Sequence, residues 1–205
     1  MDFNGGYVAA ASTAIYRDGV GCGGCFQIRC RNSKLCGSGG VRVVLTDLHK
    51  KNNNTDFVLS SMAFNAMARP GMAMQLKKLA TVDIEYKRIP CEYKNHNLTL
   101  RVEDGSQNPS NLAINFLYQG GQTDILTVEV AQVGSSNTRY MSRRGYSAVW
   151  NMSDAPGGEL RFRIAVIGGY EPSWIWTEKV LPADWKIGSV DDSGVQITEI
   201  AQDRC

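Results

Sequence analysis

The chain has 205 residues, of which 43% are hydrophobic and 20% charged, with a formal net charge of +2. This is the composition of a globular protein long enough for one large or two small domains, and its longest apolar runs are far too short to span a bilayer, so we expect no membrane association. Residues 1–103 carry 14 Lys and Arg against 8 Asp and Glu, whereas residues 104–205 carry 8 against 12. The opposite charges of the two halves predict two domains. The basic residues of the first half occur singly or in pairs, so we expect no nucleic-acid binding.

The first half is predicted to consist mainly of strands and loops. Residues rich in β-branched and aromatic side chains predict strands over 26–30, 41–45, 82–86 and 98–102. Between residues 60 and 79, apolar side chains recur near helical spacing until Pro70 and Gly71 interrupt the pattern. This segment therefore predicts one or two short helices.

The second half predicts short strands at regular spacing, separated by glycine-rich turns. The expected strands are 112–118, 125–133, 148–152, 160–167 and 174–180. Apolar and polar residues alternate over 160–166, which favours an antiparallel β-sandwich. Residues 103–110 contain Gly and Pro and no aliphatic side chain, so we expect a linker there. The predicted domains are residues 1–103 and 111–205.

Four of the six cysteines lie within fifteen residues. They are Cys22, Cys25, Cys30 and Cys36, and the other two are Cys91 and Cys205. A strand predicted between Cys25 and Cys30 holds their thiols apart, which suits separate disulfides better than one metal ion. A structural zinc site is the alternative, but the chain has only one Cys-x-x-Cys pair and both histidines lie far away in sequence. Disulfides imply an oxidising compartment, so we expect a secreted protein without a metal or other cofactor.

Five motifs resemble, in order and in register, those of the plant expansins. They are Gly21-Cys22-Gly23-Gly24-Cys25-Phe26, Thr46-Asp47, Ala63-Phe64-Asn65-Ala66-Met67-Ala68, Tyr86-Lys87-Arg88-Ile89-Pro90-Cys91 and Val180-Leu181-Pro182-Ala183-Asp184-Trp185-Lys186-Ile187-Gly188. Residues 84–86 and 193–198 are most similar to the expansin-like A branch. The resemblance covers nearly the whole chain. It implies a mainly β fold, with a six-stranded double-psi β-barrel related to family-45 endoglucanases and barwin, followed by a β-sandwich carbohydrate-binding domain.

The same resemblance implies how the cysteines pair. Its bridges would be Cys25–Cys91 and Cys30–Cys36, and Cys22 would pair with a cysteine upstream of residue 1. An early barrel strand with an aromatic motif would lie upstream too. We therefore expect these 205 residues to lack part of the first domain and to begin without a signal peptide, as in a mature or truncated chain.

Carboxylates decide whether this fold hydrolyses sugars. A glycosidase of the related endoglucanase type needs an acid and a base about 6.5 to 9.5 Å apart. The resemblance places Val58 where expansins keep their acid and Asp56 where they keep a histidine, so we expect no enzymatic activity. Thr46 and Asp47 match groove residues of the family, although an aspartate at this position also caps turns. As an alternative, a one-residue slip in loop 52–54 would bring Asp56 toward the position of the acid.

Exposed aromatic rings are the expected polysaccharide-binding groups of the second domain. The candidates are Tyr118, Tyr146, Trp174 and Trp176. The resemblance places Tyr146 on the cellulose-binding platform of the family, while Tyr118 is a weaker candidate. Ser110 and Asn111 stand where many relatives carry aromatic residues, so the platform is expected to be depleted.

Together these observations predict a secreted, monomeric cell-wall protein. It is expected to bind wall polysaccharides such as cellulose, xyloglucan or other matrix glycans, and to loosen cellulose–matrix contacts without hydrolysis. A weak glycanase that uses Asp47 and Asp56 is the first alternative, and a barwin-like wall-binding or defence module is the second. Of three glycosylation sequons, the one at Asn53 lies in a polar loop and is the most plausible.

Overall fold

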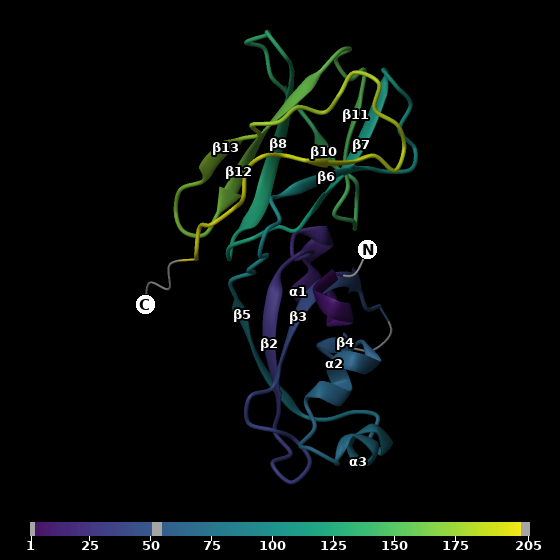
Figure 1. Cartoon of the computed structure of the whole chain (residues 1–205), viewed down its shortest axis with the longest axis vertical. Coiled ribbons are helices and arrows are strands. Elements are labelled where there is room, and N and C mark those ends of the chain that lie inside the picture. Colours follow the sequence, from purple (N-terminus) through teal and green to yellow (C-terminus); the bar gives the residue numbers. More distant parts are fainter. Residues whose placement is uncertain (1–2, 51–54, 202–205) are drawn as a thin grey trace. The chain divides into compact units, whose positions relative to one another are not determined.

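A computed structural model of the protein describes residues 3–50 and 55–201, which form two compact units (Figure 1). The first unit contains Met1–Arg17 and Gly21–Ile89, and the second contains Asp18–Val20 and Pro90–Cys205. The boundary lies earlier than the linker expected at 103–110, because strand β6 (Thr99–Val102) pairs with β7 (Asn111–Leu117) in the second unit. The predicted fold class, a mainly β protein with two β-rich parts, is confirmed.

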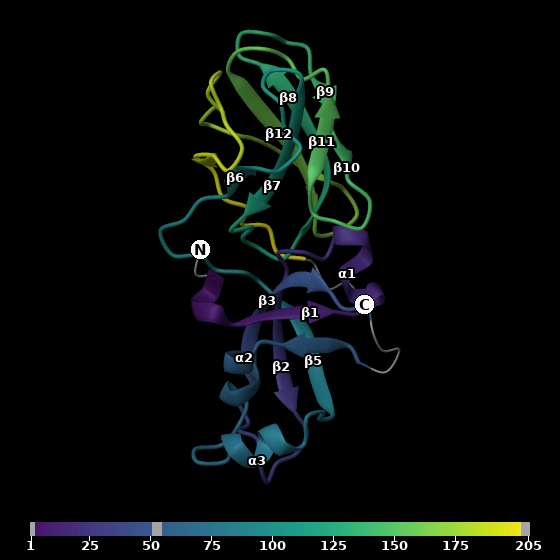
Figure 2. The same ribbon diagram turned by 90° about the vertical axis from the view of Figure 1, so that its right-hand side faces the viewer.

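The first unit is built on a five-stranded sheet with the order β4-β1-β3-β2-β5 (Figure 2). Its strands are β1 (Val8–Ala11), β2 (Cys25–Cys30), β3 (Val41–Leu48), β4 (Phe57–Leu59) and β5 (Ile84–Ile89). Strands β1 and β3 are parallel with a bulge between Ala9 and Ala10, whereas the other neighbours are antiparallel. This mixed pairing brings the ends of β3 and β4 to either side of β1.

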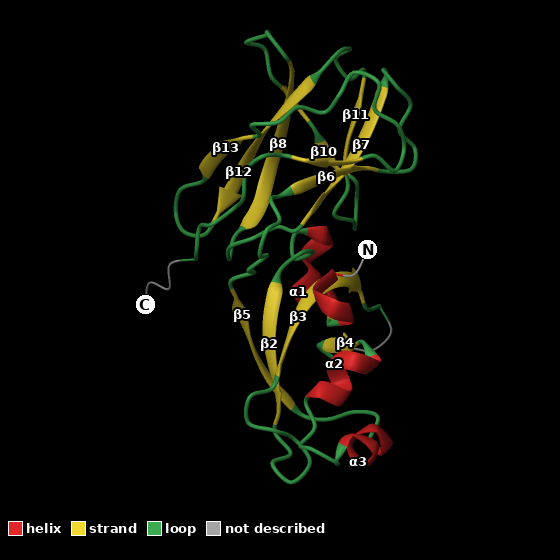
Figure 3. Cartoon of the chain, viewed as in Figure 1, coloured by secondary structure: helices red, strands yellow, loops and turns green. Residues whose placement is uncertain are grey.

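Short helices complete the first unit (Figure 3). They are α1 (Thr13–Tyr16), α2 (Ser61–Ala66), α3 (Ala73–Lys78) and the 3-10 turn η1 (Phe3–Gly6). A further 3-10 turn, η2 (Arg17–Gly19), follows α1 and belongs mostly to the second unit. Helix α2 begins after Ser60, whose side-chain oxygen accepts a hydrogen bond from the Ala63 N–H at 3.2 Å and so caps the helix. Gly71 has a φ of +79°, a conformation that interrupts a helix, so the segment predicted to hold one or two helices holds two.

The core of the first unit lies between its sheet and these helices. Alternation along β2 buries Phe26 and Ile28, and Leu45 of β3 joins them. Ala63 and Leu76, from α2 and α3, are fully buried in the same cluster. Burial of one stripe of each helix, rather than helix length, therefore stabilises these short helices.

The expected disulfides are present. Cys30, at the end of β2, is bonded to Cys36, and Cys25 and Cys91 are disulfide-bonded as well, in agreement with the expected second bridge. Cys22 carries a thiol whose Sγ lies 3.8 Å from the carbonyl oxygen of Thr46. Cys205 lies outside the described residues.

The second unit is an antiparallel β-sandwich. One sheet has the order β10-β11-β7-β6-β14 and the other the order β13-β12-β8-β9. The remaining strands are β8 (Asp124–Gln132), β9 (Arg139–Tyr140), β10 (Ser142–Arg143), β11 (Trp150–Ser153), β12 (Leu160–Ile167), β13 (Ser173–Trp176) and β14 (Val190–Asp192). Phe162 and Ile164 of β12 face Leu112 and Ile114 of β7 across a continuous core, as the alternation over 160–166 predicts.

No helix in residues 3–50 and 55–201 is long and apolar enough to cross a membrane. Within the same ranges, no group of three or more His, Cys, Asp or Glu side chains is arranged to hold a metal ion.

Candidate functional site

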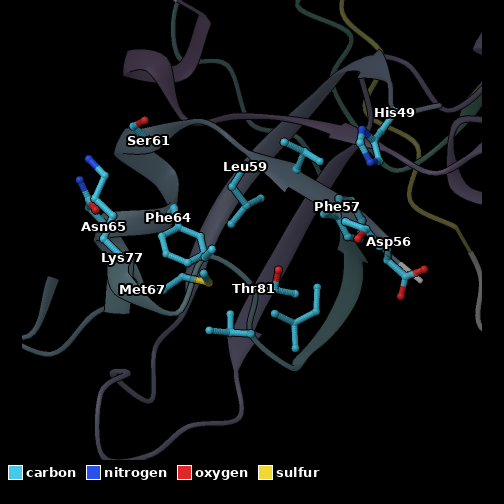
Figure 4. A pocket seen from close by; sticks show the side chains of 15 residues that line it. His49, Asp56, Phe57, Leu59, Ser61, Phe64, Asn65, Met67, Lys77 and Thr81 are labelled. Atoms are coloured by element: carbon cyan, nitrogen blue, oxygen red, sulfur yellow. The ribbon is translucent and has the colours of Figure 1, made fainter. Parts of the chain in front are cut away.

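A cavity of about 530 Å³ opens in the first unit beside β4, α2 and α3 (Figure 4). Its apolar lining includes Phe57, Val58, Leu59, Phe64, Met67, Val82 and Ile84. Polar side chains lie at its ends, with His49 and Asp56 at one end and Asn65 and Lys77 at the other. A concave, largely apolar site with a few polar groups at its rim is the usual form of a ligand-binding site.

Strand β4 sets which side chains enter this cavity. Phe57 is 8% exposed and packs into the core, whereas Val58 is 43% exposed and stands on the opposite side of the strand. Pairing of Ala10 with Val58 and of Ala11 with Phe57 fixes this register against β1. Asp56 lies in the bend just before β4, and its side chain is among those that line the cavity.

Asp56 is the only carboxylate among the described residues that line the cavity. Its backbone oxygen accepts a hydrogen bond from the Ser12 N–H at 2.9 Å, which ties the start of β4 to the end of β1. The carboxylate also has an electrostatic effect on its surroundings. The pKa of Tyr86 is raised above 10.0, first because the phenol is partly buried and second because the negative charge of Asp56 lies nearby.

Tyr86 also belongs to a small aromatic cluster under the Asp56 end of the cavity. Its ring packs edge-on against Phe57 with the centroids 4.9 Å apart, and Phe57 packs against Phe26 at 5.3 Å. Such edge contacts fix the ring positions. A phenol is protonated at neutral pH, so the Tyr86 hydroxyl is a hydrogen-bond donor at this end of the first unit.

Thr46 and Asp47 lie at the exposed end of β3, outside the cavity lining. The Thr46 hydroxyl donates to the carbonyl of Ala9 at 3.4 Å, and Asp47 Oδ1 accepts the N–H of Leu48 at 2.7 Å. This hydrogen bond lies within β3 and closes no turn, so it does not decide between the groove and turn-capping roles of Asp47. Its second carboxylate oxygen, Oδ2, is not used in that bond.

His49 is a lining residue to which the sequence assigned no role. Its backbone N–H donates to the carbonyl of Ala11 at 2.7 Å, which holds it beside the end of β1 and close to Asp56 along the cavity rim. The position follows from the parallel pairing of β1 with β3. Because β1 was not predicted, no sequence signal placed His49 at this cavity.

In the second unit, the two predicted tyrosines differ in how open they are. Tyr146 is 69% exposed in the turn between β10 and β11, where its φ of +57° is unusual for a residue with a side chain. Tyr118 is half-buried, because its ring is stacked on His96 at 4.6 Å and contacts Tyr93 edge-on at 5.4 Å. Tyr146 therefore presents a ring to solvent, whereas one face of Tyr118 is covered.

The sheet that carries the Tyr146 turn has a polar outer face. Asn111 and Ser153 are paired across β7 and β11, as are Ala113 and Asn151. These residues, together with Asp104 and Arg144, line a small hollow of about 210 Å³. The polar character agrees with the expectation that aromatic rings are depleted here. The sequon residue Asn53 lies outside the described residues.

Comparisons with known proteins place these features in a family. Residues 8–86 match the family model described as lytic transglycolase, a double-psi β-barrel family, and residues 98–182 match that of the expansin C-terminal domain. Expansin-like A3 of Oryza sativa subsp. japonica is 54% identical to the chain over 98% of this chain and 73% of that protein. Expansin-like A2 of Arabidopsis thaliana is 52% identical over 99% of this chain and 77% of that protein.

Solved structures share the fold. A crystal structure of the apo expansin of Clavibacter michiganensis matches with a TM-score of 0.68 at 18% identity, over 93% of this chain and 82% of that one. A mutant of the same expansin in complex with cellohexaose matches with a TM-score of 0.69 and the same coverage. At this identity the likeness concerns the fold alone. The sequence matches show that the chain belongs to the expansin family, within its expansin-like A branch.

Proposed function

We propose that the protein binds cell-wall polysaccharides and weakens the non-covalent contacts between cellulose and matrix polymers without cleaving either. The observation that carries this proposal is that Asp56 is the only carboxylate among the described residues that line the cavity of the first unit. By the resemblance to expansins, Val58 would stand at the position of the family's acid. An acid and a base are both needed for glycoside hydrolysis, and a valine side chain supplies neither.

Binding is proposed to use the groups that remain at the cavity. Asp56 would accept hydrogen bonds from sugar hydroxyls, the Tyr86 hydroxyl would donate to sugar oxygens, and the apolar lining would cover the C–H faces of the sugar rings. Thr46 and Asp47, at the end of β3, are proposed to contact the same glycan beyond the cavity. The related bacterial expansin in complex with cellohexaose supports a β-glucan as the ligand class.

Tyr146 is the proposed contact of the second unit, since it is the most open of the predicted rings on its sheet. Tyr118 contributes less, because one face of its ring is covered by His96. The hydrophilic residues of the adjoining hollow would bind hydroxyls of a hydrated matrix glycan more readily than a flat crystalline surface. We further propose that the protein acts as a monomer, outside the cell and in the wall, where family members act.

The alternative of a weak glycanase is tested with a sensitive reducing-end assay on cellulose, xyloglucan and mixed-linkage glucan. We expect no release above that of heat-denatured protein. Release that disappears in both Asp47→Ala and Asp56→Ala would show that these two carboxylates work as a catalytic pair and would overturn the non-hydrolytic proposal.

Loosening is tested separately from binding with clamped, heat-inactivated wall strips under constant load. We expect the protein to increase their extension, because it displaces glycan contacts that carry the load. A protein that binds the strips but leaves extension unchanged would instead be a wall-binding module, as in the barwin-like alternative.

A further inference from the structure

The sandwich has a second outer face, on the sheet β13-β12-β8-β9, that none of the proposed contacts uses. Four side chains form one row across this sheet, each paired in register with the next: Trp176 with Arg163, Arg163 with Glu129, and Glu129 with Tyr140. Directly paired residues of antiparallel strands point to the same face. Since the core contains Phe162, Ile164 and Val128 from the alternate positions, this row stands on the outside of the sandwich.

Glu129, in the middle of the row, is a buried acceptor that lacks a hydrogen bond. Its side chain is 4% exposed, and its Oε2 has no hydrogen-bond partner among the described residues. The closest cationic atom is Arg163 Nη1 at 3.6 Å, which is beyond hydrogen-bonding distance. A buried carboxylate needs a compensating charge, and Arg163 supplies it, so Glu129 holds the half-exposed guanidinium of Arg163 at the outer face.

The rings at the ends of the row are open to solvent. Tyr140 is 69% exposed and Trp176 is 39% exposed, although both lie on regular strands. The Arg163 guanidinium lies 3.9 Å from the ring centre of Trp174 but 6.0 Å from that of Trp176, and Arg161 lies 5.3 Å from Trp176. Trp174 therefore fixes Arg163 by a close cation–π contact, while the ring of Trp176 is less tightly covered.

We propose that this row is a second glycan-binding site, on the opposite face of the sandwich from Tyr146, and that it takes a neutral β-linked glycan chain running across the strands. The proposal rests on the proposed function, because it assumes that the protein binds wall polysaccharides. Sugar rings would lie on Trp176 and Tyr140, and hydroxyls of the units between them would accept hydrogen bonds from Arg163, which Glu129 holds in position.

The spacing and charge of the row favour this ligand class. Neighbouring strands lie about 4.8 Å apart, so four strands spread the row over about 14 Å, the length of a few sugar units. The central groups are one acceptor and one cation that balance each other in charge. An acidic glycan would bring its carboxylates against the buried carboxylate of Glu129, whereas a neutral hydroxyl both donates and accepts.

The test uses the full chain with cellohexaose as the neutral probe and a hexagalacturonate as the acidic probe. Tyr140→Ala removes an exposed ring and leaves the core intact, and Glu129→Gln keeps the shape while removing the charge. Tyr170→Ala, at a tyrosine that is 85% exposed outside the row, is the matched control. Tyr146→Ala tests glycan binding on the other face of the sandwich. Near-ultraviolet circular dichroism checks that each variant is folded.

We expect cellohexaose to shift the indole N–H signal of Trp176 in a saturable way. We expect Tyr140→Ala and Glu129→Gln each to weaken cellohexaose binding by about 5- to 10-fold, with no change in Tyr170→Ala. A Trp176 signal that does not move, or row variants that bind like the wild type while Tyr146→Ala binds weakly, would overturn this site and leave the proposed function standing. Stronger binding of hexagalacturonate at the row would overturn the ligand class. If the wild-type protein bound no glycan at all, the proposed function itself would be overturned.

Discussion

The two units carry binding groups of different kinds. The first unit encloses an apolar cavity with a single described carboxylate, Asp56, at its rim, whereas the second presents rings such as Tyr146 and Tyr140 on open surfaces. A cavity fixes the orientation of a ligand, which is what hydrolysis requires, but we propose that this one lacks a proton donor because Val58 stands in place of the family's acid. On this proposal, the first unit keeps the shape of a glycan site without its catalytic chemistry, and the open rings of the second unit add affinity.

The largest expected effect is a loss of stability that is confined to one of the two hydrophobic cores. Phe162 is fully buried in the core of the second unit, so Phe162→Ala should lower the free energy of unfolding of that unit by about 3–5 kcal/mol. Calorimetry should show its transition at lower temperature and the transition of the first unit little changed. Leu126→Ala, at a leucine that is 45% exposed, is the control and should cost well under 1 kcal/mol. If both transitions fell together, the two cores would have to be treated as one.

The next effect tests the cavity. Asp56→Asn removes the charged acceptor at its rim and should weaken binding of a soluble β-glucan by about tenfold, or about 1.4 kcal/mol, as measured by calorimetric titration. Glu85→Gln changes an exposed carboxylate of β5 that does not line the cavity and should leave affinity unchanged. Equal affinities for the wild type and Asp56→Asn would show that the glycan does not bind at this cavity.

A smaller effect is expected on the Tyr146 side of the second unit. Tyr146→Ala removes a ring that is 69% exposed and should weaken retention on insoluble cellulose by about fivefold, as one stacking contact is lost. Tyr118→Ala should have a weaker effect on retention, because one face of that ring already stacks on His96. The reverse order of the two variants would contradict the assignment of Tyr146 as the open contact.

The smallest effect is a dependence of stability on pH. The pKa of Asp192 is lowered below 3.8, mainly by the hydrogen bond from Lys179 Nζ at 2.6 Å and then by the N–H of Gly194. A carboxylate with a lowered folded-state pKa stabilises the protein above its unfolded-state pKa, and this contribution is lost as the pH falls through the lowered value. Since Asp192 is largely exposed, its contribution is about 0.2–1 kcal/mol.

Asp192→Asn measures this contribution directly. Denaturant unfolding should show the variant less stable than the wild type at pH 6, with the difference shrinking as the pH falls below 3.8. A difference that stays constant over that range would show that the ion pair with Lys179 does not contribute through its charge.

Strong local patterns made much of the fold predictable. The strand predicted over 160–167 has the same bounds as β12, and helical spacing between residues 60 and 79 predicted the one or two helices that are found there as α2 and α3. Strand β1, Val8–Ala11, was missed because three of its four residues are alanine, which has little preference for strands. The segment 103–110, expected to be a linker, is a turn between β6 and β7 that is closed by the bridge of Gln107 with Asn111. Linkers and turns are both rich in Gly, Pro and polar residues, so local composition does not distinguish a linker from a turn.

The sites were less predictable, because they depend on which strands become neighbours. The resemblance to expansins drew attention to Val58 and Asp56, but His49 reaches the same cavity only through the pairing of β1 with β3. Alternation indicates that Glu129 points away from the core, yet it does not reveal that Arg163 and Tyr140 flank it. These contacts join residues that are distant in sequence, and no local pattern encodes them.

The most direct test of non-hydrolytic binding is to incubate the protein with cellohexaose in ¹⁸O-labelled water and to analyse the sugars by mass spectrometry. We expect intact cellohexaose and no labelled shorter oligosaccharides, even with the protein in excess. Labelled fragments that appear with the wild type and disappear with Asp56→Asn would show that the cavity cleaves glycosidic bonds, and would contradict the proposal that the protein acts without hydrolysis.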